Sequence, residues 1–177
     1  MWSSLLEALR RRRFPPEARL AEVGVSKGMK VADVGAGFGF FAFPAAEMVG
    51  DEGVVYAVEP NALRAAEISK RVAERHVKNL KVLEAGAEDI GGIPAAEVDI
   101  AMSMSSFHHF TDAKRGLVEL GRIVRPGGLI YIRDIKAGRI VRQGSRGEGF
   151  RKSVSQEFPR AKFEEGSGYL LARVRLD

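Results

Sequence analysis

One stretch near the start of the chain limits the possible folds more than any other. Val31–Val34 is a short apolar run interrupted only by Asp33, and it predicts a buried strand. Three glycines follow, at Gly35, Gly37 and Gly39, before a helical pattern begins. A strand, a glycine turn and a helix hold nucleotide-like ligands in many proteins, because glycine permits unusual backbone angles and lets a ligand approach the main chain.

The spacing of these glycines narrows the class of ligand. The dinucleotide fingerprint G-x-G-x-x-G would place its third glycine at position 40, which is Phe40, whereas the third glycine here is Gly39. No Gly-Lys-Ser/Thr of a phosphate-binding P-loop follows. With Asp33 two residues before Gly35, the stretch resembles the first motif of class I S-adenosylmethionine-dependent methyltransferases.

This resemblance implies a cofactor without phosphate, whose methionine part carries a carboxylate and an ammonium beside a sulfonium. It implies that Asp33, Gly35 and Gly37 hold the methionine part, with Ala36 between the glycines. Amides at a helix end suit the carboxylate, and Asp33 suits the cationic side. The alternative interpretation is a tight turn that binds no ligand.

A second acidic residue stands where such a cofactor would need one. Val54–Val58 is an unbroken apolar run, typical of a parallel strand covered on both faces, and it ends at Glu59-Pro60. Glu59 follows the glycines by about 20 residues, the spacing at which a carboxylate accepts both ribose hydroxyls. We therefore assign Glu59 and Pro60 to the cofactor site; the alternative is an acid in a turn or helix cap.

The loop after the third predicted strand, Leu80–Leu83, departs from the family pattern. In the resembled family this loop meets the adenine ring, often with an acid that binds the exocyclic amine. Gly86 occupies the position of that acid here. Glu88, Asp89 or a water molecule remains to bind the amine, and Ala87 still offers its backbone N–H.

The segment after the fourth predicted strand, Val98–Met102, carries two adjacent histidines. Phe107-His108-His109 resembles the fourth motif of the ubiquinone/menaquinone-biosynthesis type of methyltransferase, where Leu-His-His is common. The resemblance implies that Ser103 ends the strand and borders the sulfonium. The segment lacks the Asn/Asp-Pro-Pro-aromatic motif of enzymes that methylate amines of nucleic acid bases.

Three residues are candidates for catalysis. His108 or His109 could be a general base for a hydroxyl group, but we favour the interpretation that one packs under the cofactor and fixes the loop by hydrogen bonding. Asp134 follows the fifth predicted strand, Leu129–Ile132. It contacts the substrate or balances Arg133, and we favour the second role.

The remaining segments complete an α/β pattern. Helices are predicted at 2–9, 17–23, 40–49, 63–76, 113–124 and 150–158, a turn at 125–128, and a final hairpin from 161–165 and 169–176. We predict one Rossmann-like domain with a doubly wound seven-stranded sheet, mostly parallel, ending in an antiparallel hairpin. Its regions are N-terminal helices (1–26), a cofactor-binding core (27–135) and a C-terminal hairpin region (136–177).

Composition excludes several kinds of chemistry. The 177 residues include no cysteine, which removes disulfides, thiolate metal sites and cysteine nucleophiles, and we expect no metal. Together with two Asn and two Gln, this indicates a thermophilic protein. No apolar run has the length of a membrane span or signal peptide, so we expect a cytoplasmic protein.

The sequence thus predicts methyl transfer from S-adenosylmethionine to a small-molecule acceptor by in-line displacement. Two alternatives stay open. The net charge of +5 and the arginine clusters at 10–13 and 133–152 would suit an RNA-directed methyltransferase, although a solvated basic surface is the favoured interpretation. The other alternative is a cofactor-binding partner subunit without activity. The acceptor, the methylated atom and the oligomeric state are not predicted.

Overall fold

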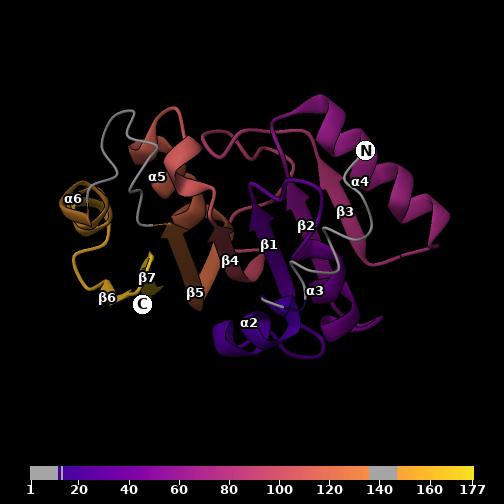
Figure 1. Ribbon diagram of the computed structural model, residues 1–177, viewed down its shortest axis with the longest axis horizontal. Coiled ribbons are helices and arrows are strands. Elements are labelled where there is room, and N and C mark those ends of the chain that lie inside the picture. The colour runs from indigo at the N-terminus through magenta and orange to yellow at the C-terminus, as the bar shows by residue number, and fades with distance from the viewer. Residues whose placement is uncertain (1–11, 13, 136–146) are drawn as a thin grey trace.

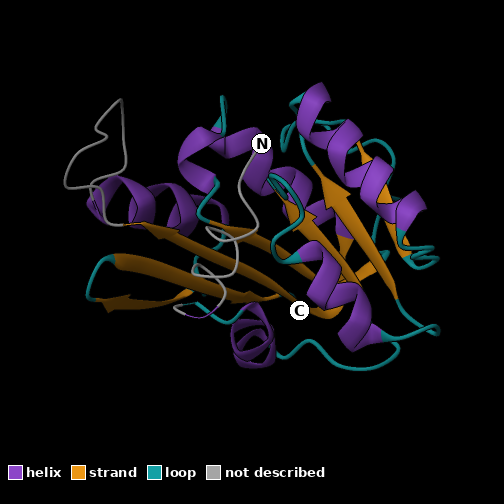
Figure 2. Cartoon of the chain, turned by 45° about the vertical axis from the view of Figure 1, so that its right-hand side comes forward, coloured by secondary structure: helices purple, strands orange, loops and turns teal. Residues whose placement is uncertain are grey.

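The computed structural model describes residue 12 and residues 14–135 and 147–177 of the chain (Figure 1). The helix predicted at 2–9 lies outside the described residues. Seven strands form one sheet in the order β3-β2-β1-β4-β5-β7-β6, and helices cover both of its faces (Figure 2). The predicted fold class, a doubly wound and mostly parallel sheet, is confirmed.

The elements have the following bounds. The strands are β1 (Lys30–Val34), β2 (Val54–Val58), β3 (Leu80–Leu83), β4 (Val98–Met104), β5 (Val124–Ile135), β6 (Lys162–Gly166) and β7 (Tyr169–Arg175). The helices are α2 (Pro16–Val23), α3 (Ala42–Val49), α4 (Ala62–Glu74), the 3-10 helix η1 (Phe107–His109), α5 (Ala113–Ile123) and α6 (Gly147–Glu157).

The topology gathers strand ends at one edge of the sheet. Strands β1 to β5 are parallel, whereas β7 pairs antiparallel with both β5 and β6, so the predicted C-terminal hairpin is confirmed. The chain order reverses at β1, which lies between β2 and β4. In open α/β sheets a ligand binds at this switch point, beyond the carboxyl ends of the strands.

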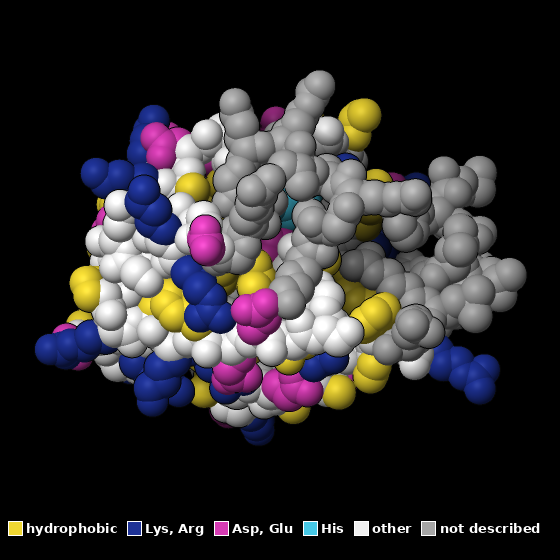
Figure 3. Space-filling view, turned by 60° about the vertical axis from the view of Figure 1, so that its left-hand side comes forward, with side chains coloured by type: hydrophobic (Ala, Val, Ile, Leu, Met, Phe, Trp, Pro, Cys, Tyr) yellow, Lys and Arg dark blue, Asp and Glu magenta, His cyan; other side chains and the backbone are white. Residues whose placement is uncertain are grey.

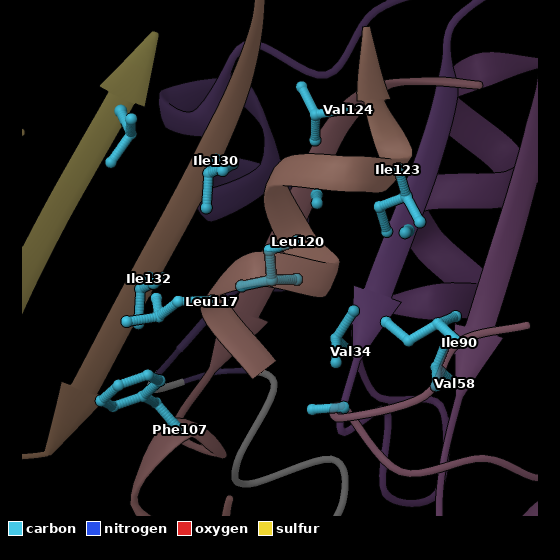
Figure 4. Close-up of a cluster of buried hydrophobic side chains, with 14 of the residues drawn as sticks. Val34, Val58, Ile90, Phe107, Leu117, Leu120, Ile123, Val124, Ile130 and Ile132 are labelled. Carbon is cyan, nitrogen blue, oxygen red and sulfur yellow. The ribbon is translucent and has the colours of Figure 1, made fainter. Parts of the chain in front are cut away.

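The core consists of two layers of apolar side chains, one on each face of the sheet. Along β1, Val31 joins the layer beneath α2 and α3, while Ala32 and Val34 join the layer beneath α5. Figure 4 shows the second layer, where Leu117 and Leu120 of α5 lie over the strands. Because both faces are covered there, the central strands β1, β2 and β4 are largely apolar and buried rather than alternating.

Strands β4 and β5 differ from their predicted bounds by two residues or more. Strand β4 continues past Met102 to Met104, so that Ser103 lies inside it. Strand β5 begins at Val124 and therefore includes 125–128, the predicted turn. The pairing with β4 jumps from Val98↔Val124 to Ile100↔Leu129, so the extra residues of β5 form a bulge instead of a separate turn.

Among the described residues, no helix has the length and apolar character needed to cross a bilayer.

We expect Leu120→Ala to lower the free energy of unfolding by about 2–5 kcal/mol, because it leaves a cavity where the side chain is fully buried. Urea denaturation measures the change. The matched control on the same helix is Val118→Ala, whose side chain is 45% exposed and which should change stability by less than about 0.5 kcal/mol. Equal effects of the two variants would contradict the described packing of α5.

Candidate functional site

A cavity of about 510 Å³ opens at the switch point of the sheet. Its volume lies in the range of small-molecule and cofactor sites. Nine predicted site residues line it: Asp33, Gly35, Ala36, Gly37, Pro60, Gly86, Ala87, Glu88 and His109. Four predicted site residues do not line it: Glu59, Ser103, His108 and Asp134.

The glycine loop after β1 needs glycine for two different reasons. A Cβ on Gly35 would lie 2.4 Å from the Cβ of Ser106, so a side chain is excluded by the close approach of the β4 loop. Gly37 has a φ of +61° and no atom within 4 Å of its missing Cβ. At Gly37 the backbone conformation requires glycine, and the main chain is open to a ligand in the cavity.

Glu59 is not among the residues that line the cavity, and it holds the glycine loop. Its Oε2 accepts a hydrogen bond from the Gly37 N–H (2.8 Å), and its Oε1 accepts one from the Asn61 N–H (3.1 Å). The residue is only 3% exposed. The structure therefore brings the glycine turn and the second predicted acid into contact. Each carboxylate oxygen keeps capacity for a further donor.

Asp33 carries a buried oxygen that lacks a donor. The residue is 2% exposed and lines the cavity, and among the described residues no hydrogen bond reaches its Oδ2. Burial, together with the negative charge of Glu59, raises the pKa of Asp33 to about 7. A buried acceptor without a donor is unfavourable. A cationic donor entering the cavity would satisfy this oxygen and stabilise the ionised form.

Glu88 fills the space left by the missing acid at position 86. A Cβ built on Gly86 would lie 2.9 Å from Glu88 Oε2. The other oxygen, Oε1, accepts hydrogen bonds from the Thr111 N–H (2.6 Å), the Thr111 hydroxyl (2.9 Å) and the Asp112 N–H (3.0 Å). Burial opposes ionisation of Glu88, but these bonds outweigh it and lower its pKa. Of the two acids considered, Glu88 lines the cavity and Asp89 does not.

Ser103 does not border the cavity, which corrects its predicted position at the strand end. Its side chain is fully buried, and its Oγ lies 2.8 Å from Ser106 Oγ. Ser106 in turn donates to the Val34 carbonyl (2.7 Å). Because β4 runs two residues further than predicted, Ser105 and Ser106 line the cavity instead. The local sequence Ser-Met-Ser-Ser offered no signal to distinguish these serines.

His108 and Asp134 form a pair outside the cavity lining. The Asp134 Oδ1 lies 2.7 Å from His108 Nδ1, and Oδ2 accepts a hydrogen bond from the His108 N–H (2.8 Å). Arg133, the expected partner of Asp134, instead stacks on the Tyr169 ring with its guanidinium 4.1 Å from the centroid. Asp134 therefore ties the histidine loop to β5, a role that the sequence did not predict for it.

His109 faces the cavity. Its ring centroid lies 3.9 Å from that of His108. Burial, followed by the proximity of His108, lowers the pKa of His109, so its neutral form is favoured at neutral pH. Of the two histidines, His108 thus fixes the loop and His109 lines the site.

Sequence reasoning missed the apolar wall of the cavity. Phe40 and Phe41 were predicted to begin a helix, but α3 starts at Ala42, which leaves both rings in the loop. The hydrophobic periodicity of the sequence could not identify Phe40 and Phe41 as cavity residues. Apolar residues directly before a helix have the same pattern as the buried face of the helix itself. The cavity lining that was not predicted consists of Phe38, Phe40, Phe41, Arg64, Arg71, Met104, Ser105, Ser106, Phe110 and Thr111.

Comparisons with known proteins agree with this geometry. A family model described as "Methyltransferase domain" matches residues 32–132. Aklanonic acid methyltransferase DauC of Streptomyces sp. (strain C5) is 34% identical over 103 residues, which cover 58% of this chain and 46% of that protein. The ubiquinone/menaquinone biosynthesis C-methyltransferase UbiE of Francisella philomiragia is 27% identical over 114 residues, 64% of this chain and 45% of that protein.

Among solved structures, the chain is similar to a SAM dependent methyltransferase from Aquifex aeolicus, with a TM-score of 0.81 and 24% identity. That match covers 95% of this chain and 93% of the other, and at this identity it shows the shared fold. The chain spans less than half the length of the two curated relatives described above.

We expect Asp33→Asn to stabilise the ligand-free protein above neutral pH. In the folded state the Asp33 carboxyl stays protonated up to about pH 7, whereas in the unfolded state it ionises near pH 4. The parent protein therefore loses stability as the pH rises from about 4 through about 7. At about pH 8 the variant should be more stable than the parent by roughly 1–3 kcal/mol, and at about pH 4 the two should be similar.

Urea unfolding at the two pH values measures this difference. The control is Asp51→Asn at an exposed position, which should change stability equally at both. If the parent instead becomes more stable relative to Asp33→Asn as the pH rises from about 4 to about 8, Asp33 is not a buried carboxyl without a donor.

Proposed function

The chain belongs to the methyltransferase domain family, in its class I S-adenosylmethionine-dependent form, and we propose that it methylates a small acceptor built on an apolar ring system. Its cofactor is S-adenosylmethionine. The observation that carries the proposal is the unsatisfied buried oxygen of Asp33, a residue that lines the cavity together with Gly37.

The residues present fit the methionine part of the cofactor. Asp33 offers a buried carboxylate oxygen that needs a cationic donor, and an ammonium group is such a donor. The main chain at Gly37 is open on the cavity side and can lie against the ligand. When bound, the cofactor supplies a methyl group already activated by a sulfonium.

The other cofactor contacts follow from the strand ends. Glu59 directly follows β2, and each of its carboxylate oxygens can accept one further hydrogen bond. We assign the two ribose hydroxyls of the cofactor to these oxygens. Ala87 and Glu88 line the part of the cavity beyond β3, where we place the adenine ring. Ser105 and Ser106, in the loop after β4, replace Ser103 in our proposal as the residues that border the reacting end.

The protein's own contribution to the reaction is alignment and exclusion of water. Phe40, Phe41, Met104 and Phe110 make much of the cavity wall apolar. Such a wall favours a flat apolar acceptor and keeps water from the reacting atoms. The two relatives described above are named for ring compounds, namely aklanonic acid, ubiquinone and menaquinone, which supports an acceptor of this class.

The RNA-directed alternative depends on arginine clusters that lie largely outside the described residues, at 10–11, 13 and 136–146. On the part of the surface in Figure 3 that described residues form, Lys and Arg side chains are interspersed with Asp and Glu rather than gathered in one patch. Salt-dependent binding of RNA would favour this alternative, because phosphate contacts weaken as salt rises. A screen for methyl transfer with labelled cofactor separates an enzyme from a non-catalytic partner subunit.

We expect Glu59→Ala to weaken binding of S-adenosylmethionine by roughly 10- to 100-fold, because hydrogen bonds to a charged group are lost. Isothermal titration calorimetry measures the affinity. Glu59→Gln retains an acceptor for the Gly37 N–H, so its affinity should lie between those of the parent and Glu59→Ala. The matched control is Glu74→Ala, at an exposed position on α4, which should bind like the parent. Equal affinities for all four proteins would remove Glu59 from the cofactor site.

We also expect Glu88 to recognise the adenine amine in place of the acid missing at Gly86. The wild-type protein should bind S-adenosylhomocysteine about tenfold more tightly than S-inosylhomocysteine, which carries a carbonyl instead of the amine. In Glu88→Gln this preference should shrink to about twofold or less, since the amide is a weaker acceptor. A preference that survives the substitution unchanged would assign the amine to another group.

A further inference from the structure

Among the described residues, four charged side chains line the cavity, and three of them already have a role. The two acids, Asp33 and Glu88, are assigned to the ammonium group and the adenine amine of the cofactor. Arg71 is held by the protein itself, because its Nη1 donates a hydrogen bond to the Phe38 carbonyl (2.6 Å) and so supports the glycine loop. The fourth is Arg64, to which no cofactor contact is assigned.

The guanidinium of Arg64 has only weak contacts within the described part of the chain. Its Nη1 lies 3.8 Å from Glu59 Oε1, which is too far for a hydrogen bond, and its Cζ lies 5.6 Å from the centroid of the Phe38 ring. The side chain is 50% exposed. An ion pair of this kind contributes little to stability, because water screens it. The N–H donors of this guanidinium are therefore available to a ligand.

The backbone that carries this side chain is fixed. Arg64 lies in the first turn of α4, and its N–H donates a hydrogen bond to Oδ1 of Asn61, the residue that caps the helix (3.1 Å). Because Arg64 also lines the cavity, the helix holds it at the edge of the site. The long side chain itself can still move toward a ligand.

The positive charge of Arg64 reaches the part of the cavity that the histidine loop lines. Burial is the main cause of the lowered pKa of His109, followed by the proximity of His108, and the charge of Arg64 lowers this pKa as well. A ligand that lies between Arg64 and the apolar side chains of Phe40 and Phe41 is therefore close to a cation. An uncharged ring would cover that cation without pairing with it, whereas an anionic ring compound would neutralise it.

We propose that Arg64 is a specificity-determining residue that binds a carboxylate on the apolar ring system of the methyl acceptor. This inference rests on the proposed function and defines its acceptor class more closely. The fork of N–H groups on a guanidinium matches the two oxygens of a carboxylate, so two parallel hydrogen bonds can form. Arg64 adjoins Glu59, which we assign to the ribose and not to the reacting sulfur. Arg64 is therefore a recognition residue and not a catalytic one.

Binding of the cofactor should make Arg64 more available to the acceptor. In the ligand-free protein the guanidinium pairs with Glu59 Oε1, which is one of the two oxygens that we assign to ribose hydroxyls. A hydroxyl at this oxygen competes with the guanidinium for the same acceptor atom. The carboxylate of the methyl acceptor would then replace Glu59 as the partner of Arg64. The preference for an anionic acceptor should consequently be greater when the cofactor site is filled.

The test compares 2-naphthoate with 2-naphthamide, which has nearly the same shape but no charge, by calorimetry on the protein saturated with S-adenosylhomocysteine. We expect the parent to bind 2-naphthoate about tenfold more tightly, because hydrogen bonds between charged groups are the stronger ones. Arg64→Gln should lower this preference to about twofold or less, and Arg64→Lys should show an intermediate preference, since lysine keeps the charge without the fork. Without S-adenosylhomocysteine the preference of the parent should fall to about threefold.

The matched control removes a positive charge elsewhere on α4. Lys70 has a side chain that is 64% exposed and does not line the cavity, so Lys70→Gln should prefer 2-naphthoate as strongly as the parent does. The affinity of Arg64→Gln for S-adenosylhomocysteine should stay within about threefold of the parent, because no assigned cofactor contact is removed. That affinity also shows that the variant is folded.

The inference fails if neither naphthalene compound binds, if the parent does not prefer 2-naphthoate, or if the preference survives in Arg64→Gln. A loss of the preference in Lys70→Gln would assign it to the overall charge of the surface. The inference also fails if Arg64→Gln loses more than about threefold in affinity for S-adenosylhomocysteine but none for 5′-methylthioadenosine, which lacks the amino acid part, because Arg64 would then bind the cofactor carboxylate. If the parent does not bind S-adenosylhomocysteine, the proposed function itself is wrong, and calorimetry detects that outcome separately.

Discussion

A hydrogen bond of 2.8 Å from the Gly37 N–H to the Glu59 carboxylate joins the loop after β1 to the end of β2. The Val58 carbonyl strengthens this junction by accepting hydrogen bonds from the N–H groups of Gly35 (2.8 Å) and Ala36 (3.0 Å). On the other side Gly35 packs against Ser106, so β4 also fixes the loop. The loop after β1, which lines the cavity, is therefore held in place by residues at the end of β2 and in the loop after β4.

The same contact concentrates negative charge in a buried place. Asp33 and Glu59 are both almost fully buried, and burial together with the charge of Glu59 makes ionisation of Asp33 less favourable. Glu59 has donors for both oxygens, whereas Asp33 Oδ2 has none among the described residues. The ligand-free fold therefore contains a buried oxygen without a hydrogen-bond donor, which lowers stability and which a cationic ligand would satisfy. Such conflicts between stability and binding are common at functional sites.

The sequence predicted the strands β2 and β3 at their observed bounds, because short, mainly apolar runs bounded by turn residues favour strands. It predicted the glycine turn and Glu59 because their spacing reflects the geometry of one βαβ unit. It could not predict that Asp134 pairs with His108, since 26 residues separate them and only the finished sheet brings them together. The exchange of Ser103 for Ser105 and Ser106 has a similar origin, because the length of β4 depends on its pairing with β5.

The unsatisfied carboxylate of Asp33 also makes the stability of the folded chain sensitive to a bound ligand. Any ligand that binds only the folded chain raises its stability in proportion to the logarithm of its concentration, and a ligand that donates to Asp33 does so by completing the interior of the protein. Cells with a depleted methyl-donor pool would hold more of the chain in its less stable form, open to proteolysis. Turnover of the chain would then follow the concentration of that ligand.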